Sequence, residues 1–401
     1  MKIPTALYTT VLTALAAGAV STAAAATADE LFDDSVVHEI RLTTHPSDWR
    51  KLRENYFDNT YYVASFAWRG IVVEDVGIRS RGNGSRSSAK PGLKVDFNRF
   101  TPGQEFLGLK SLVLDNLTQD PTFIRERLSM LMFRRMGLPA PRLAHARLIV
   151  NGAYAGLYTI VERIDQTFLK RTLNENDGYL YDYEWSDENW FEYRGSDLSA
   201  YSPYPFQAET HEQNPDARPI EQMIRTMNEV SDEKFVRAMS TYLDLNRFLD
   251  YLATETFLAE GDGLVGEWGL NNFYLYRFQG SSISTLIPWD KDVTFQEADR
   301  SIWRNMERNV LTRRVLADAK LRAYFLEALE RAMELAGGPG GWLEQEIDRA
   351  SEQIRTAVSD DPHKPFSYAD FEQDVSHLRY FAFERPGFVA NQIADSRAGN
   401  Q

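Results

Sequence analysis

The spacing of apolar residues along this chain changes from a period of two to a period of about 3.6, the helical value. The first part holds short alternating or β-branched segments bounded by glycine, proline and asparagine, a pattern typical of strands. We predict strands over residues 36–42, 61–66, 72–79, 93–97, 147–150 and 156–162, and a later pair over residues 273–278 and 283–288. We predict helices over residues 220–230, 232–242, 245–260, 311–336, 341–358 and 370–395. The pattern indicates an α+β fold with a mainly β first lobe and a mainly α second lobe.

The boundary between the two lobes is predicted at Asp165, after a hairpin that turns at Asn151-Gly152. The first lobe then spans residues 27–165 and the second spans residues 166–401. Early in the second lobe, residues 177–220 are aromatic, acidic and rich in proline and serine. A segment of this length without a clear period is typically either functional or poorly ordered. We expect its aromatic side chains either to line a substrate cleft or to pack onto the second lobe.

Carboxylates and amides stand at the loop ends of one helix–hairpin unit, within residues 261–295. Asp262 lies in a glycine-flanked loop after the helix, Asn271 and Asn272 open the hairpin, and Asp290 and Asp292 leave it. Because the two ends of a hairpin meet, Asn272 and Asp290 are expected to be neighbours in space.

These side chains offer hard oxygen donors, which suit Mg²⁺ or Mn²⁺ and argue against zinc or copper. Phosphoryl transfer from a nucleotide needs one aspartate to accept the proton of the attacking hydroxyl, and an asparagine with a second aspartate to hold the metal. The alternative is a set of solvated turns, because Asp, Asn and Gly are the commonest loop residues.

A glycine-rich tip in the first lobe is a candidate phosphate-binding loop. Arg81 precedes Gly82, Gly84 and Ser85, and Lys94 lies on the strand that follows. Backbone N–H groups and a guanidinium fork at such a tip can bind phosphate oxygens. The alternative is a simple turn, since glycine pairs of this spacing are common.

Glu126 is a candidate partner for Lys94. It lies early in a helix that we predict to begin at Asp120-Pro121, with proline in the first turn. A glutamate at this place can orient the phosphate-binding lysine, as kinase sites require. The alternative is a solvated glutamate favoured by the helix N-terminus.

Composition limits the partners and the compartment. The 401 residues carry a formal charge of −14, which argues against a nucleic-acid binder and against docking on an anionic membrane. Residues 1–26 have a positive start, an apolar alanine-rich stretch and a small-residue cleavage site, so we predict a signal peptide and export. No other segment is long and apolar enough to span a bilayer. The chain has no cysteine, so an exported protein of this sequence depends on its core alone.

Several motifs, in matching order over residues 35–395, resemble the spore-coat protein H (CotH) kinase family. The motifs are Arg81-Gly-Asn-Gly-Ser85, Lys90-Pro-Gly-Leu-Lys-Val-Asp-Phe97, Asp120-Pro-Thr-Phe-Ile-Arg-Glu126, Asn151-Gly-Ala-Tyr-Ala-Gly-Leu-Tyr158, Val161-Glu-Arg-Ile-Asp165, Asn272-Phe-Tyr-Leu-Tyr276 and Pro288-Trp-Asp-Lys-Asp292. The resemblance implies an atypical protein-kinase-like fold and a secreted or spore-coat kinase. The implied cofactors are ATP and Mg²⁺ or Mn²⁺, with Ca²⁺ as an alternative, and the implied partner is a protein substrate with a Ser or Thr hydroxyl.

By position, the resemblance makes Asp262 the catalytic base and Lys94 the phosphate-contacting lysine. It makes Asn272 and Asp290 metal ligands and matches Asp292 to the second aspartate of the same motif. The nucleotide-binding set is completed by Arg81, Gly82, Gly84, Ser85, Glu126 and Glu162. Nine residues separate Asp262 from Asn272 where ordinary kinases have four, and Asn271 is an alternative metal ligand.

Two other classes of function fit parts of the sequence. An exported acidic module could be a cell-surface adhesin or scaffold with a degenerate kinase fold, a class favoured by the scarcity of ATP outside cells. A metal-dependent hydrolase could use Asp290 and Asp292, but it gives no role to the glycine-rich tip or to Lys94. We therefore predict an exported kinase, with the binding protein as the alternative.

Overall fold

The computed structural model describes residues 26–399 of the chain. The predicted signal peptide, residues 1–26, lies outside this range except for its last residue. Among the described residues, no helix combines the length and the apolar character needed to cross a membrane.

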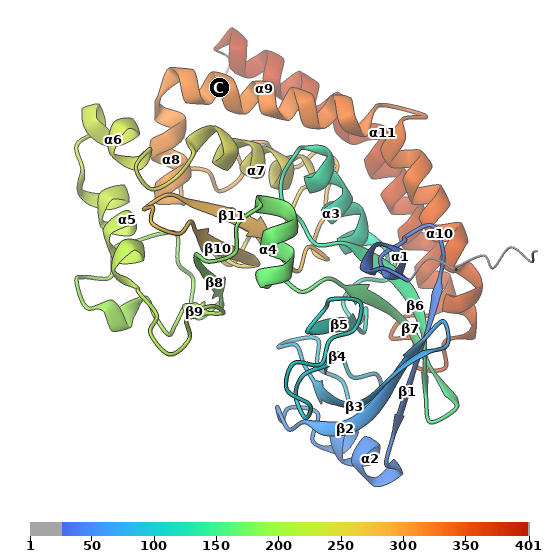
Figure 1. Cartoon of the computed structure of the whole chain (residues 1–401). Helices are drawn as coiled ribbons and strands as arrows, with labels where there is room; N and C mark the ends of the chain where they lie inside the picture. Colours follow the sequence, from blue (N-terminus) through green and yellow to red (C-terminus); the bar gives the residue numbers. More distant parts are fainter. Residues whose placement is uncertain (1–25, 400–401) are drawn as a thin grey trace, which may run out of the picture.

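The first lobe is a closed barrel of seven strands in the order β1-β2-β3-β4-β5-β7-β6 (Figure 1). Its strands are β1 (His38–Thr44), β2 (Tyr62–Trp68), β3 (Ile71–Ser80), β4 (Leu93–Asp96), β5 (Ser111–Asp115), β6 (Leu143–Val150) and β7 (Ala153–Val161). Neighbours pair antiparallel except β1 and β6, which pair in parallel and close the barrel. Along β1 every second residue is buried, beginning with His38, as its alternating sequence predicts. Phe66, Phe97 and Phe106 pack edge-on or tilted in the barrel interior.

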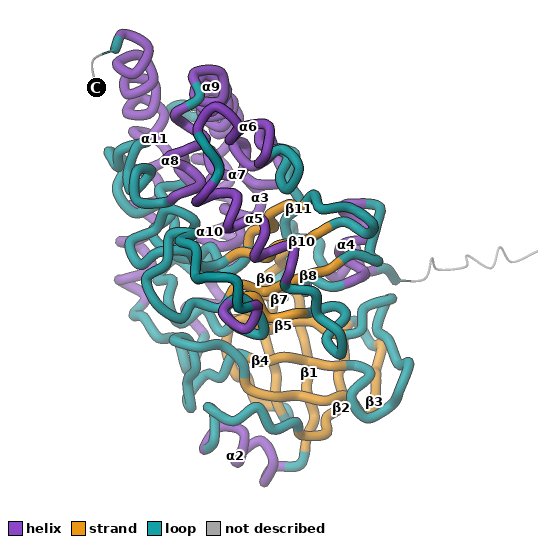
Figure 2. Tube along the Cα trace, turned by 90° about the vertical axis from the view of Figure 1, so that its left-hand side faces the viewer, coloured by secondary structure: helices purple, strands orange, loops and turns teal. Residues whose placement is uncertain are grey.

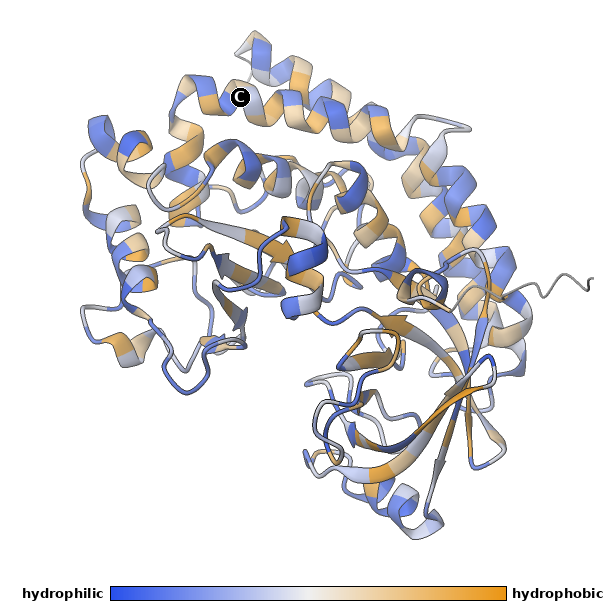
Figure 3. Cartoon of the chain, in the orientation of Figure 1, coloured by the Kyte–Doolittle hydropathy of each residue, from blue (hydrophilic) through white to orange (hydrophobic). Residues whose placement is uncertain are grey.

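The second lobe combines helices with a four-stranded sheet in the order β11-β10-β8-β9 (Figure 2). The strands of this sheet are β8 (Tyr179–Tyr183), β9 (Phe206–Ala208), β10 (Phe273–Arg277) and β11 (Ser284–Pro288). The α-helices within residues 26–399 are α1 (Ala28–Leu31), α2 (Pro46–Glu54), α3 (Arg125–Arg135), α4 (Gln166–Leu173), α5 (Arg218–Glu229), α6 (Asp232–Met239), α7 (Leu245–Phe257), α8 (Val310–Ala317), α9 (Ala319–Ala336), α10 (Trp342–Asp360) and α11 (Tyr368–Ala398). In Figure 3 the long C-terminal helices alternate between hydrophobic and hydrophilic residues, as helices with one face in a core do. The predicted α+β, two-lobed fold is confirmed.

Several boundaries differ from the sequence prediction, and two of the differences have clear local reasons. The helix predicted over residues 311–336 is two helices, because Asp318 caps α9 by accepting from the N–H groups of Lys320 and Leu321. The helix predicted to begin at Asp120-Pro121 begins at Arg125, whose N–H donates to Asp120 Oδ2 at 2.8 Å. The helix before the site ends at Phe257.

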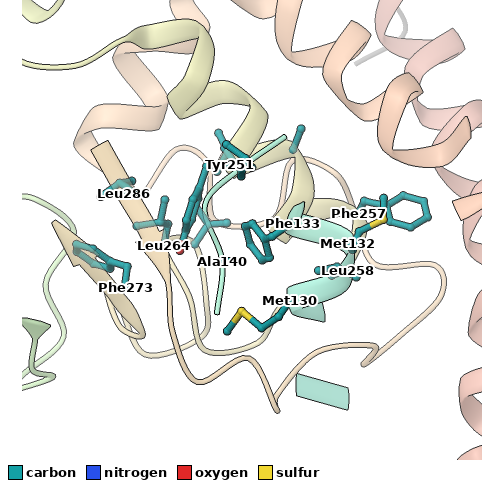
Figure 4. Packing of buried hydrophobic residues seen from close by; sticks show 14 of the residues in the cluster. Met130, Met132, Phe133, Ala140, Tyr251, Phe257, Leu258, Leu264, Phe273 and Leu286 are labelled. Atoms are coloured by element: carbon teal, nitrogen blue, oxygen red, sulfur yellow. The ribbon is translucent and has the colours of Figure 1, made fainter. Parts of the chain in front are cut away.

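Helix α3 lies between the barrel strands in sequence but packs into the core of the helical lobe. Its residues Met130, Met132 and Phe133 lie beside Tyr251 of α7 and Phe257 in Figure 4. The ring centroids of Phe133 and Tyr251 are 5.1 Å apart. The core therefore passes from one lobe to the other, and α3 carries its N-terminal turn to the interface.

The C-terminal helices also join the lobes. Helices α10 and α11 run along one side of the molecule, and α10 packs against β7 of the barrel (Figure 1). At the end of α10, Asp361 forms a buried ion pair with Lys90, with 2.8 Å between Nζ and Oδ2. The Leu157 N–H of β7 donates to the same carboxylate oxygen at 2.9 Å. The segment that follows the glycine-rich tip is thus anchored to the far end of the chain.

Candidate active site

The hairpin of β10 and β11 brings Asn272 and Asp290 together, as predicted. Phe273 pairs with Pro288, and the N–H of Trp289 donates to the carbonyl oxygen of Asn272 at 3.2 Å. Asn272 and Asp290 both have left-handed backbones, with φ of 58° and 50°. Asn and Asp tolerate this region better than other side chains, and such strain gathers at functional sites.

Asp262 is held in place by both asparagines. The Nδ2 of Asn271 lies 3.0 Å from each carboxylate oxygen of Asp262, and the Nδ2 of Asn272 lies 3.0 Å from Oδ2. Asn272 also donates to the carbonyl oxygen of Asp262 at 3.0 Å. The loop after α7 and the start of β10 therefore present one carboxylate with a defined orientation.

Glu126 reaches this site from α3. It is 8% exposed and lies in the first turn of the helix. Burial raises its pKa well above the usual range, the carboxylates of Asp290 and Asp115 raise it further, and the Arg81 guanidinium opposes them. Burial, together with Asp290 and Glu126, raises the pKa of Asp292 in the same way. Glu126 of the first half of the chain and Asp290 of the second thus lie close enough for the Asp290 carboxylate to raise the pKa of Glu126.

Arg81 is the cation that the structure places against these carboxylates. Its Nη1 lies 3.6 Å from Oδ2 of Asp115, the last residue of β5. Burial and Asp115 raise the pKa of Asp290 to about 6, and Arg81 is the first group that lowers it. Sequence reasoning missed Asp115 because residues 111–115 were not predicted as a strand. Their apolar run ending in aspartate carries the same signal as the strand before Asp290.

Lys94 lies elsewhere on the lobe interface, and its predicted pairing with Glu126 is not formed. Within residues 26–399, no ion pair joins the two side chains, and the charges acting on Lys94 come first from Arg163 and Arg79. Burial, with these two guanidinium groups, lowers the pKa of Lys94 to about 8. The reason is register: Lys94 is paired with Arg79 across β3 and β4, whereas Arg81 lies beyond the end of β3 and reaches Asp115.

A strip of charged groups links Lys94 to Arg81. Arg163 is paired with Glu209 at 2.5 Å, and Glu209 acts on both Lys94 and Asp182. Burial and Glu209 raise the pKa of Asp182 to about 7, and Arg81 lowers it. A cavity of about 370 Å³ opens beside Arg163 and Glu209. Lys94 and the acidic cluster around Asp290 therefore stand at two ends of one interlobe strip.

The glycine-rich tip is a rigid loop. Arg86 donates to the carbonyl oxygens of Gly82 and Tyr56, and Asn116 donates to those of Ser85 and Lys90. Gly82 has φ of 108°, and a Cβ there would meet Ser85 Oγ at 2.5 Å, so glycine is required. Gly84 has open space around it, which leaves the tip accessible.

Glu162, which we predicted to bind the nucleotide, is buried and forms ion pairs within the protein. It is 2% exposed, and its carboxylate is paired with Arg142 at 2.8 Å and Arg171 at 2.5 Å. The N–H of Arg142 donates to Oε2 at 3.0 Å. Its hydrogen-bonding capacity is used within the protein, so Glu162 joins the end of the barrel to α4 and is not free to bind a nucleotide.

The fit of a divalent metal rests on charge and donor type. Within the described residues, no group of three or more His, Cys, Asp or Glu side chains has the arrangement needed to hold a metal ion. Asp290 nevertheless raises the pKa of both Glu126 and Asp292, and Asp115 raises the pKa of all three, so these buried carboxyl groups are gathered near Asp115. Together with the amide of Asn272, these oxygen donors suit Mg²⁺ or Mn²⁺.

Comparison with known proteins places this two-lobed chain among the kinase-like proteins. The family described as CotH kinase protein matches residues 78–389, most of the sequence. The chain therefore belongs to the CotH kinase family, which confirms the resemblance drawn from its motifs. It is similar to inner spore coat protein H of Bacillus subtilis (strain 168), with 26% identity over 366 residues that cover 88% of this chain and 97% of the relative.

Two solved structures show weaker similarity. One is a Helicobacter pylori proinflammatory kinase, CtkA, with 10% identity, coverage of 80% of this chain and 96% of that chain, and a TM-score of 0.30. The other is a golgi casein kinase, with 10% identity, coverage of 92% of this chain and 77% of that chain, and a TM-score of 0.31. These scores are too low to support an argument about the site.

Proposed function

We propose that this protein is an exported kinase that transfers the γ-phosphoryl group of ATP to a Ser or Thr hydroxyl of a protein, with Mg²⁺ or Mn²⁺. The observation that carries the proposal is that Arg81 of the first lobe lies over the ring of Trp289, with 5.6 Å to the ring centroid, next to Asp290 in the second lobe and near Glu126. A phosphate-binding cation placed close to metal-binding carboxylates is what nucleotide phosphoryl transfer requires.

In this proposal Asp262 accepts the proton of the attacking hydroxyl. Asn271 and Asn272 hold the carboxylate in one orientation, which reduces the entropy lost when the acceptor binds. Glu260, the next candidate base on the same loop, is 4% exposed, and its Oε1 already accepts from the Asp262 N–H at 2.7 Å. Asp262 is therefore the better placed of the two.

Asn272, Asp290 and Asp292 would hold the divalent metal, with Glu126 as an additional carboxylate beside them. The ion would neutralise charge that develops on the transferred phosphoryl group. Arg81 and the N–H groups of the tip would hold the phosphates, and Lys94 would approach the nucleotide from the other end of the charged strip. Family membership supports the reaction class, and the choice of a protein Ser or Thr hydroxyl as the acceptor rests on the resemblance.

Export is part of the proposal and rests on residues 1–26. Mass spectrometry of the mature protein purified from the producing cell tests it directly. We expect a chain that begins near residue 27 and lies outside the cytoplasm. A protein that still carries residues 1–26 would contradict the proposed export.

Calorimetry with ATP, in the presence of Mn²⁺ and then of EDTA, tests the central claim. We expect binding that depends on the metal, together with transfer of labelled phosphate to the chain itself or to Ser/Thr peptides. Absence of binding, or binding unaffected by EDTA, would favour an adhesin or scaffold on the same fold.

A further inference from the structure

A buried lysine lies between the two aspartates of the second site loop. Lys291 separates Asp290 from Asp292 in sequence, but its side chain turns inward. Its Nζ donates to Oε1 of Glu255 in α7 at 2.7 Å, and both side chains have no exposed surface. The loop that carries the metal-binding aspartates is thereby tied to the helix that precedes Asp262.

Glu255 and Glu260 bind the loop that carries Asp262 through hydrogen bonds to its backbone. The second oxygen of Glu255 accepts from the N–H of Leu264 at 2.9 Å, and Glu260 Oε1 accepts from the N–H of Asp262 at 2.7 Å. A Cβ at Gly263 would lie 2.6 Å from Glu255 Oε1 and 2.8 Å from Glu260 Cγ. The loop therefore packs directly on the two glutamates, and a larger residue at Gly263 would displace it.

Further hydrogen bonds close the arrangement around these three side chains. The N–H of Gly261 donates to the carbonyl oxygen of Val293 at 2.8 Å. The hydroxyl groups of Ser129 in α3 and Thr294 lie 2.8 Å apart. The two site loops and the helix that carries Glu126 thus meet at one buried junction.

We propose that Lys291, Glu255 and Glu260 are positioning residues, which hold Asp262 and the Asp290–Asp292 loop in the one arrangement that phosphoryl transfer needs. The proposal rests on the function proposed above. Burying an ion pair costs desolvation free energy that a well-packed apolar pair avoids, so stability alone is a weak reason for this network. A displacement of about 1 Å at a reacting group can cost about 100-fold in rate.

The first test compares two substitutions of one residue. Glu260→Gln keeps an oxygen that can accept from the Asp262 N–H, whereas Glu260→Met removes it. We expect Glu260→Met to lower kcat by about 10- to 100-fold with little change in KM for ATP, and Glu260→Gln to restore most of the rate. The control is Glu221→Met, since Glu221 is equally buried at 4% exposure and lies in α5. Equal kcat in Glu260→Met and the unsubstituted protein would overturn the proposal.

The second test removes the tie between the loops without leaving a buried charge unpaired. Lys291→Met alone would leave the buried Glu255 carboxylate without its cationic partner, which could prevent folding. Lys291→Met with Glu255→Gln removes both charges and keeps an acceptor for the Leu264 N–H. We expect this double variant to fold, to bind ATP with Mn²⁺, and to transfer phosphate at least about tenfold more slowly. Full transfer by the folded double variant would show that the ion pair is only structural.

Hydrogen–deuterium exchange of residues 258–270 supplies a readout that does not depend on catalysis. We expect faster exchange in Glu260→Met and in the double variant, and unchanged exchange in Glu260→Gln. Unchanged exchange in all variants would overturn the positioning role. Faster exchange in these two variants, together with an absence of nucleotide binding by the unsubstituted protein, would keep the positioning role and refute the proposed function instead.

Discussion

Asn272 and Asp290 lie at the two ends of one hairpin, and both have a left-handed backbone, with φ of 58° and 50°. A non-glycine residue in a sparsely populated backbone region costs about 1–3 kcal/mol, and the cost persists only where the surroundings impose it. Here the pairing of β10 with β11 imposes it at both ends. The hairpin thus holds an amide and a carboxylate beside each other at the edge of the interlobe strip.

Asp290→Asn should weaken metal-dependent ATP binding by at least about tenfold, because it removes a ligand charge. The folded protein without ligand should become as stable or more stable, since the change relieves repulsion with Glu126 and Asp292. Calorimetry and thermal unfolding measure the two effects. The control is Asp177→Asn at an exposed position. A variant that binds ATP and Mn²⁺ normally would show that Asp290 is not a ligand.

Asp262→Asn should leave ATP binding nearly unchanged and lower phosphoryl transfer by about 100- to 10,000-fold, the usual contribution of a general base. One amide–carboxylate contact with Asn271 or Asn272 becomes unfavourable, so stability should fall by about 1 kcal/mol. Single-turnover kinetics with preloaded ATP separate the two effects. Retention of full transfer would move the base to another residue, with Glu260 or Glu267 to be tested next.

Arg81 and Lys94 should differ in what they contribute. Arg81→Met removes the cation beside Glu126 and Asp290, so ATP affinity should fall by about 10- to 100-fold and the ligand-free protein should lose stability. Lys94→Met should also weaken ATP binding, but it should stabilise the ligand-free protein, because burial disfavours the charged lysine. Chemical denaturation and calorimetry distinguish the variants. Unchanged ATP affinity in Lys94→Met would assign the phosphate contact to Arg81 alone.

The pattern of apolar residues was enough to predict the class of fold and the order of most elements. It failed where tertiary structure decides. Strand β5 is short and buried on both faces, so it shows no alternation. Helix α3 begins later than predicted because the Asp120 carboxylate accepts hydrogen bonds from the Thr122 hydroxyl and from the N–H groups of Thr122 and Arg125. Phe123, within this turn, has a left-handed backbone. The period of apolar residues does not reveal such a turn.

The candidate site was predicted best where its residues are close in sequence. The hairpin fixes Asn272 beside Asp290, and both could be assigned from turn signals alone. Contacts across the lobes could not be assigned, because they depend on how strands are paired in the barrel. That is why Arg81, and not Lys94, faces Glu126, and why Glu162 is enclosed by two arginines.

The stability of the ligand-free protein should depend on pH through Asp290. Its pKa is about 6 in the folded protein against an ordinary 3.8, so the folded chain binds more protons than the unfolded chain between these values. The contribution of Asp290 to the free energy of unfolding is therefore fully present below about pH 4. It is lost as the pH rises through about 6, and the loss amounts to at most about 3 kcal/mol. Urea unfolding at pH 5 and pH 7, with and without Asp290→Asn, measures it. An equal pH dependence in both proteins would contradict the prediction.

The buried pair of Lys90 and Asp361 has a consequence for the order in which the protein can mature. The two residues are separated by 271 positions in the chain, yet Asp361 is the partner that neutralises Lys90 beside the glycine-rich tip. In a chain that is still being synthesised or translocated, Asp361 becomes available to pair with Lys90 only after about nine tenths of the chain has left the ribosome or the translocation channel. The tip then carries an unpaired lysine that favours solvent over the interior. The segment beside the glycine-rich tip is thus expected to reach its final conformation only late in folding, after Asp361 is available.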